Sequence, residues 1–196
     1  HIVLRRRGLA PRFVPPISLI LSTRSKEYVA GLRAASYTGE PTSEEAIEGI
    51  ADWLRVFSSA AGRAAVDAER FGNQIDDLEE AWRNKLGRVR ANSAAELLLK
   101  ALPSAPVVSV ATATRLIQRS VPQTNAAVNR LTQAGVLVPV RDVQRNRAFE
   151  AVGLLDAITG FERVLASTSG DTHNSPPVRR VPARPNRGKA EKLKPT

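Results

Sequence analysis

The sequence predicts a mainly α-helical fold in which a helical region precedes a winged helix-turn-helix and a basic tail. Hydrophobic residues make up 42% of the 196 residues but aromatic residues only 5%, and alanine is abundant, which favours packed helices over a β-sandwich. Apolar residues recur in steps of three and four across residues 47–82. Further along, three short helical patterns precede two strand-like runs, an order typical of a winged helix. The predicted domains are residues 1–90, 91–166 and 167–196.

The first segment reads as the end of a helix followed by a proline-rich connection. Residues 1–10 are largely apolar and basic, and Gly8 can close the helix. Three prolines between residues 11 and 16 enforce an extended chain, because proline fixes φ and lacks an N–H group. A second helix is predicted from about Ile17 to Ala35.

The longest periodic pattern follows the N-cap candidates Thr42 and Ser43. Its apolar positions form one helical stripe: Ile47, Ile50, Leu54, Phe57, Ala61, Ala64, Ala68, Phe71, Ile75, Leu78 and Trp82. The spacing fits packing within a bundle or self-association through a coiled coil. Gly62 and Gly72 favour close packing in a bundle, and Gly72 marks a point where the helix could kink or divide.

Three serines, each at the start of an apolar pattern, place the helices of the winged helix-turn-helix. Asn92 or Ser93 begins the first helix, and Ser109 begins the second. Ser120 begins the third, which has proline in its first turn and glycine just beyond its end. Residues 136–140 and 147–151 are strand-like and are joined by a polar turn. A last helix from about Val152 to Leu165 closes the fold.

The third helix carries the candidate DNA-reading side chains. Four residues share its core-facing side by spacing: Thr124, Ala127, Val128 and Leu131. Four others are then expected to point outward: Gln123, Asn125, Asn129 and Arg130. Amides pair with adenine, and arginine pairs with guanine or a phosphate. Three arginines of the wing are placed to contact the DNA backbone: Arg141, Arg145 and Arg147. Contact with a protein partner, or a purely structural role, remains open.

The net charge of +10 lies mainly outside the long periodic helix. Residues 103–151 hold six basic and two acidic groups, whereas residues 13–102 hold eleven and thirteen. Residues 167–196 add five net positive charges, contain many prolines and carry few large apolar groups, so the tail should be disordered. A positive half of the chain favours an anionic partner such as duplex DNA, although solubility alone would also explain the tail.

The residues that most enzymes and metal sites need are scarce. The chain has no cysteine, which excludes disulfides and thiolate chemistry, and it has only two histidines. No glycine-rich phosphate loop and no grouping of nucleophile, base and orienting residue is present, so no catalytic, cofactor-binding or metal-binding residue is predicted. No apolar run approaches the roughly 20 residues that span a bilayer, so a cytoplasmic protein without a membrane partner is expected.

Four stretches together resemble the part of bacterial Fic-family (Fido domain) proteins that lies downstream of their catalytic motif. The stretches are His1–Pro11, Pro15–Ser22 with Tyr28 and Gly31-Leu32, Trp53–Phe57 with Val66–Glu69, and Val107–Leu137 with Arg145–Phe149. The last stretch is similar to the winged helix that many bacterial members append. The resemblance covers residues 1–165.

The resemblance implies that the chain is the C-terminal portion of a protein that transfers AMP from ATP, with Mg, to a hydroxyl group of a target protein. The family motif HPFxxGNGRxxR is absent, because Ile2 follows His1 where proline would stand. No catalytic residue of the family can be carried over, and this fragment alone should be inactive. The alternative is a stand-alone winged-helix regulator of transcription whose long helix dimerises.

Overall fold

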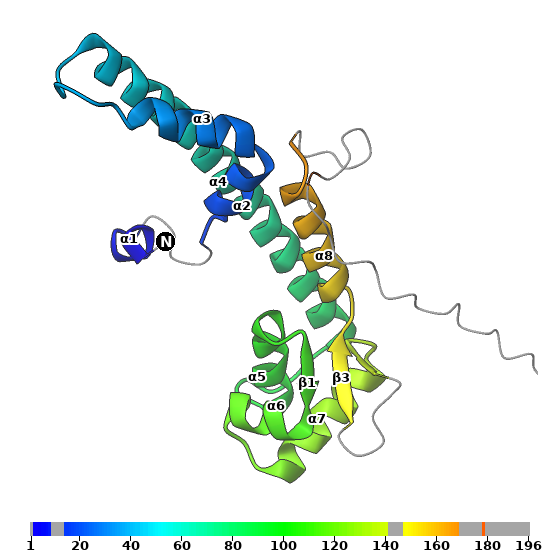
Figure 1. Cartoon of the computed structure of the whole chain (residues 1–196). Coiled ribbons are helices and arrows are strands. Elements are labelled where there is room, and N and C mark those ends of the chain that lie inside the picture. Colours follow the sequence, from blue (N-terminus) through cyan, green and yellow to red (C-terminus); the bar gives the residue numbers. More distant parts are fainter. Residues whose placement is uncertain (1, 9–13, 141–146, 169–177, 179–196) are drawn as a thin grey trace, which may run out of the picture.

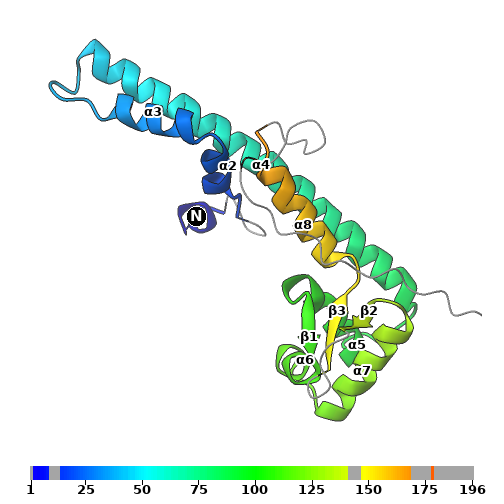
Figure 2. The same ribbon diagram turned by 45° about the vertical axis from the view of Figure 1, so that its right-hand side comes forward.

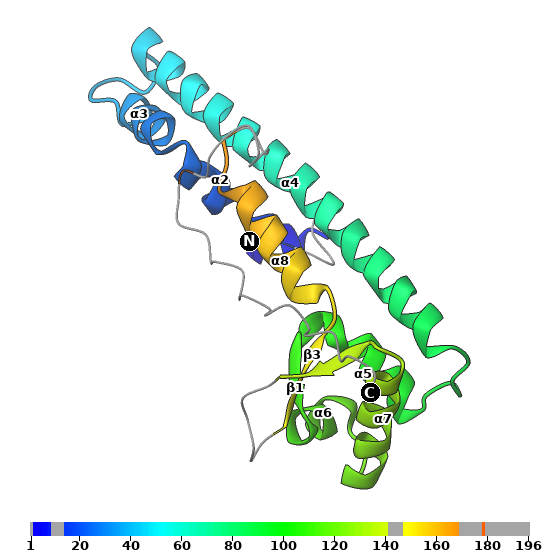
Figure 3. The same ribbon diagram turned by 90° about the vertical axis from the view of Figure 1, so that its right-hand side faces the viewer.

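The computed structural model describes residues 2–8, 14–140, 147–168 and 178, and one long helix organises it (Figure 1). This helix, α4 (Glu44–Leu86), has α3 (Ser25–Ala35) beside one end. Helix α8 (Leu154–Leu165) runs along its middle, and shorter helices with a small sheet gather at its other end (Figures 2 and 3). The fold is therefore mainly helical, as the sequence predicts.

The segment predicted as one helix from Ile17 to Ala35 is two helices. A short α1 (Ile2–Arg6) comes first, and α2 (Ile17–Thr23) and α3 are then separated at Arg24, whose φ of −113° and ψ of 40° are not helical. The Arg24 guanidinium donates a hydrogen bond to Ser59 Oγ on α4 at 3.2 Å. The helix breaks at the residue that contacts α4. The spacing of residues along the chain does not reveal this contact.

Helix α4 is continuous over 43 residues, so the kink or division expected at Gly72 is wrong. Ser43 caps it, with Oγ accepting a hydrogen bond from the Ala46 N–H at 3.2 Å. Next to Gly72, the Phe71 ring stacks on Phe161 of α8 with 4.3 Å between ring centroids. Packing of this kind offsets the cost of about 1 kcal/mol that glycine imposes on a helix interior.

The apolar stripe of α4 is covered along its C-terminal half only. Trp82 and the alanines at 64 and 68 are buried there, as predicted. In the N-terminal half the large apolar residues are exposed: Ile47 by 57%, Ile50 by 38%, Leu54 by 54% and Phe57 by 39%. Helix α3 instead covers a neighbouring face that contains Ala46 and Gly49. The prediction of a single buried stripe is therefore wrong at this end.

Close packing occurs at other glycines than those the sequence indicated. A Cβ atom added to Gly49 would lie 2.0 Å from the carbonyl oxygen of Ala34 on α3, and one added to Gly31 would lie 3.2 Å from the Trp53 ring. A Cβ atom at Gly62 or Gly72 would meet nothing within 4 Å. The close approach of α3 to α4 therefore depends on Gly49.

Residues 94–151 form a module of short helices and a small antiparallel sheet, called here the C-terminal module. Its helices are α5 (Ala94–Ala101), the 3-10 turn η1 (Leu102–Ser104), α6 (Val110–Ile117) and α7 (Val121–Gln133). Its strands are β1 (Val107–Ser109), β2 (Leu137–Pro139) and β3 (Ala148–Ala151), in the order β1-β3-β2. The hairpin of β2 and β3 is confirmed, whereas β1 was not predicted, because three residues are too short to show a period.

Two hydrophobic clusters link the module to the helices. The C-terminal end of α4 contributes Trp82 and Leu86 to the core of the module, and the Trp82 indole donates a hydrogen bond to the Val152 carbonyl at 3.0 Å. Helix α8 runs the other way, and Leu165 joins Ile20 and Ala60 in a second cluster. Helix α4 of the first predicted domain and helix α8 of the second therefore each pack against residues of the other domain.

The C-terminal end of α8 is held by one arginine of α4. The Arg63 guanidinium donates hydrogen bonds of 2.6–3.0 Å to the carbonyl groups of Val164, Ser167 and Thr168, and it pairs with the buried Asp67 carboxylate at 3.3 Å. The disordered tail was predicted for residues 167–196, but Ser167 is buried and bonded to Arg63. Residues 169–177 and 179–196 lie outside the described residues. Within the described part of the chain, no helix is both long and apolar enough to cross a membrane.

Candidate nucleic-acid interface

Helix α7 has the core-facing side that the sequence predicts. Thr124, Ala127, Val128 and Leu131 are all buried. The helix begins after Ser120, whose N–H and Oγ–H groups both donate to Oε1 of Gln123, at 3.2 and 3.1 Å. Gly135, with a φ of 68°, follows its end. Packing and capping thus fix which side of α7 faces solvent.

Two asparagines stand on the solvent-facing side of α7. Asn125 and Asn129 are exposed, and neither amide has a hydrogen-bond partner among the described residues. Each amide offers one acceptor oxygen and two donor hydrogens. The sequence of α7 contains no acidic residue that would repel an anionic ligand. This face can therefore form bidentate hydrogen bonds with a partner outside the chain.

Gln123 and Arg130, predicted to point outward with the asparagines, lie on a different side of α7. Both residues are exposed, but they line a hollow between α7 and the start of α5. The Oε1 atom of Gln123 accepts hydrogen bonds from Ser120, so only the amide N–H groups of this side chain stay free to contact a base. Arg130 Nη2 donates to the Arg88 carbonyl at 2.7 Å. The structure thus separates the four predicted residues into two pairs.

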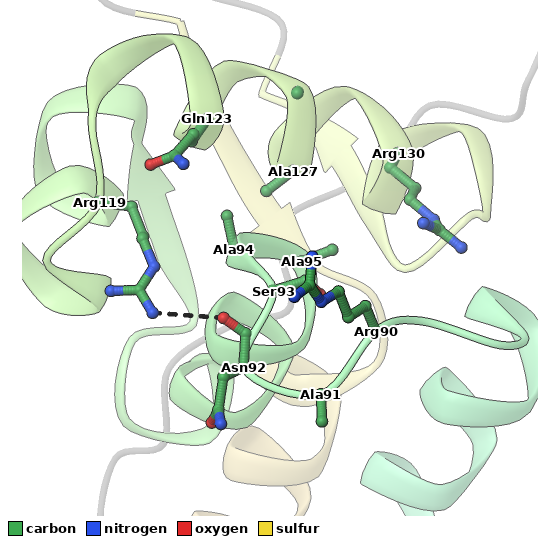
Figure 4. Close-up of a pocket in the computed structure, with 11 residues that line it drawn as sticks. Arg90, Ala91, Asn92, Ser93, Ala94, Ala95, Arg119, Gln123, Ala127 and Arg130 are labelled. Atoms are coloured by element: carbon green, nitrogen blue, oxygen red, sulfur yellow. Dashed lines mark hydrogen bonds between the residues drawn. The ribbon is translucent and has the colours of Figure 1, made fainter.

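The hollow has a volume of about 610 Å³ and contains three arginines (Figure 4). Arg119 lies with Gln123 on one side of it, and Arg90 lies with Arg130 on the other (Figure 4). Arg119 and Arg90 were not predicted. Arg119 precedes a helix cap and Arg90 lies in the connection after α4, and only the tertiary fold brings them together beside α7.

The connection between α4 and α5 is held beside α7 by a chain of hydrogen bonds. Arg119 Nη2 donates to the Asn92 carbonyl at 3.3 Å. The Asn92 N–H, in a residue with a φ of 57°, donates to the Glu96 carboxylate at 2.6 Å. The hydrogen bond from Lys100, followed by that from the Asn92 N–H, holds the pKa of Glu96 below its usual value. The charge of Glu96 therefore supports the loop that carries Arg90.

The arginines around the hollow keep their positive charge uncompensated. Within the described part of the chain, Arg90, Arg119 and Arg130 take part in no ion pair. In the sequence of the module, residues 94–151, seven basic residues stand against three acids: Glu96, Asp142 and Glu150. An excess of one charge over a surface produces a field that attracts the opposite charge. The field at this end of the molecule is positive.

The predicted wing is described in part. Arg147 is exposed and immediately precedes β3, which pairs with β2 beside α7. Arg141 and Arg145 lie outside the described residues. A role of Arg147 in DNA contact stays a prediction.

The ATP and Mg that the family resemblance implies for the parent protein stay a prediction. Among residues 2–8, 14–140, 147–168 and 178, no group of three His, Cys, Asp or Glu side chains could hold a metal ion. No catalytic step can be derived from these residues.

Comparisons with known proteins do not assign the chain to a family. No protein-family model matches it, and no curated protein matches it. The functional argument therefore rests on the geometry of the C-terminal module.

Proposed function

We propose that the C-terminal module is a winged helix-turn-helix that binds duplex DNA and places α7 in the major groove. The observation that carries the proposal is the exposed, acid-free face of α7 with the free amides of Asn125 and Asn129. Asparagine forms a bidentate pair with the N6 and N7 atoms of adenine, which are accessible in the major groove. α7 then acts as the recognition helix.

The order and pairing of the elements support this assignment. Helices α5, α6 and α7 precede the hairpin of β2 and β3, and β1 adds a third strand on the outer side of β3. In winged helices the third helix enters the groove while the hairpin reaches the backbone. Arg147, at the start of β3, would then contact a phosphate group.

The experiment first selects preferred duplexes from a random DNA pool and then measures affinity by fluorescence anisotropy. Asn125→Ala and Asn129→Ala should each weaken binding to the selected duplex by roughly 10- to 100-fold, because a bidentate contact contributes about 1–3 kcal/mol. Binding to a scrambled duplex should change little. Asn73→Ala, at an exposed amide on α4, is the matched control. Equal affinity of the wild type and both variants for both duplexes would contradict base reading by α7.

On the family resemblance of residues 1–165, we also propose that the chain belongs to a longer AMP transferase. The winged helix would then bind DNA or regulate the enzyme. The test is to read the coding sequence upstream of His1 in frame, and then to incubate the longer protein with labelled ATP. Transfer of label to a protein, lost when the motif histidine is replaced, would support this activity. A frame without the motif would eliminate it.

The exposed part of the α4 stripe favours the alternative, a stand-alone regulator that dimerises. Four large apolar residues continue the spacing of the buried half: Ile47, Ile50, Leu54 and Phe57. Such a stripe buries itself when a second helix packs along it. Light scattering should then give twice the chain mass for the wild type and a single chain mass for Phe57→Asp. A monomeric wild type at high concentration rules the dimer out.

A further inference from the structure

The arginine hollow beside α7 is distinct from the amide face that reads bases. We propose that it clamps a backbone phosphate group of the duplex, on the strand that borders the groove occupied by α7. This inference rests on the proposed DNA binding and assigns the hollow an anchoring role that is independent of sequence. Gln123 and Arg130, which the sequence predicted to contact bases, are thereby assigned to the phosphate anchor.

The hydrogen bonds of the arginines leave donors available for a ligand. Arg119 gives bonds to the carbonyls of Gln118 and Asn92, and Arg130 gives one bond to Arg88. The Arg90 side chain makes no hydrogen bond within the described residues, and its carbonyl accepts one from the Ser93 N–H at 3.0 Å. Each guanidinium carries five N–H groups, and its bonds to neutral carbonyls hold the side chain in place without cancelling its charge. Three positive charges remain to attract an anion, and those of Arg119 and Arg130 are held in place by hydrogen bonds.

The shape of the hollow suits a phosphate that belongs to a polymer. Alanine side chains at 94, 95 and 127 line it, so small groups leave room between the arginines (Figure 4). Arg90 and Arg130 are exposed at the rim rather than enclosed. Guanidinium groups bind phosphate oxygens in pairs, and an open rim admits the strand on both sides of the bound phosphate. The connection from residue 88 to residue 93 fixes the distance of this anchor from α7.

The closing experiment measures the salt dependence of duplex binding by the whole chain. Each phosphate contact releases condensed counterions, so the slope of log K against log salt falls by about 0.9 when one contact is lost. Arg90→Gln and Arg130→Gln should each lower the slope, by at most this amount because both side chains share one phosphate group. They should weaken binding to selected and scrambled duplexes by the same factor, roughly tenfold. Arg33→Gln on α3, far from the module, is the control that should change neither quantity.

The outcomes separate the anchor from the proposed function. If the wild type binds DNA but both hollow variants keep its slope and affinity, the anchor is wrong and DNA binding stands. If the wild type fails to bind any duplex at low salt, both fail. Sodium phosphate is compared with sodium chloride at equal ionic strength. Stronger displacement of DNA from the wild type by phosphate, reduced in Arg90→Gln and Arg130→Gln, supports a phosphate site in the hollow. Equal displacement by the two salts in the wild type and in both variants would overturn the anchor.

Discussion

At the residue scale, the side-chain amides of α7 have different roles according to their position in the helix. Asn125 and Asn129 keep free amides, whereas the amide oxygen of Gln123 is used to cap α7. Spacing along the helix placed Gln123 among the outward-facing residues, but capping depends on the hydrogen bonds of Ser120. A polar residue in the first turn of a helix therefore cannot be assigned to base reading from its spacing alone.

Glu96 makes the stability of the arginine loop depend on pH. Its pKa is lowered by Lys100 and by the Asn92 N–H, so its charged form favours the folded state. That contribution is complete above the ordinary glutamate pKa of about 4.3 and is lost as the pH falls through the lower pKa of the folded state. The melting temperature of Glu96→Gln should therefore lie below that of the wild type at pH 6, and the difference should shrink towards pH 3.

Glu48→Gln, at an exposed position of α4, provides the comparison for this titration. Its melting temperature should follow that of the wild type across the same pH range. A constant difference between wild type and Glu96→Gln from pH 6 to pH 3 would show that the charge of Glu96 does not hold the loop. The Glu96 carboxyl shift in an NMR titration gives an independent reading of the same pKa.

At the scale of elements, small residues rather than large ones decide how α3 meets α4. The periodic apolar residues were expected to form the buried face, but α3 packs where Gly49 allows its backbone to approach. Hydrophobic period predicts that a helix exists and how long it is. It does not predict which of two adjacent faces a neighbouring helix will cover, because close approach depends on the size of the residues.

Gly49→Ala and Gly62→Ala form a matched pair in one helix. The added methyl group at Gly49 would overlap the Ala34 carbonyl, so α3 must shift, at a cost of roughly 1–3 kcal/mol in the free energy of unfolding. At Gly62 the methyl group meets open space, and the gain in helix propensity should stabilise α4 by up to about 1 kcal/mol. Urea denaturation measures both changes. If Gly49→Ala and Gly62→Ala have the same free energy of unfolding, the packing of α3 described here is contradicted.

At the scale of the whole molecule, α4 connects the two regions predicted to be separate domains, residues 1–90 and 91–166. Its C-terminal end supplies Trp82 to the core of the C-terminal module, and α8 returns from that module along its middle. The helical order, the serine caps and the core side of α7 could all be predicted, because each depends on residues close in sequence. The break at Arg24, strand β1 and the arginine hollow could not, because each depends on contacts between distant segments.

The central claim is that α7 enters the groove of duplex DNA, and a cleavage probe on this helix tests it most directly. The chain has no cysteine, so Gln133→Cys, at an exposed position of α7 one turn beyond Asn129, can be labelled alone with an iron chelate that cuts nearby DNA. The same label on Ser58→Cys, at an exposed position of α4, serves as the control. Cuts confined to a few neighbouring nucleotides from the label at residue 133, with none from residue 58, are the predicted result. Bound DNA that neither label cuts, or that both cut alike, would contradict the claim.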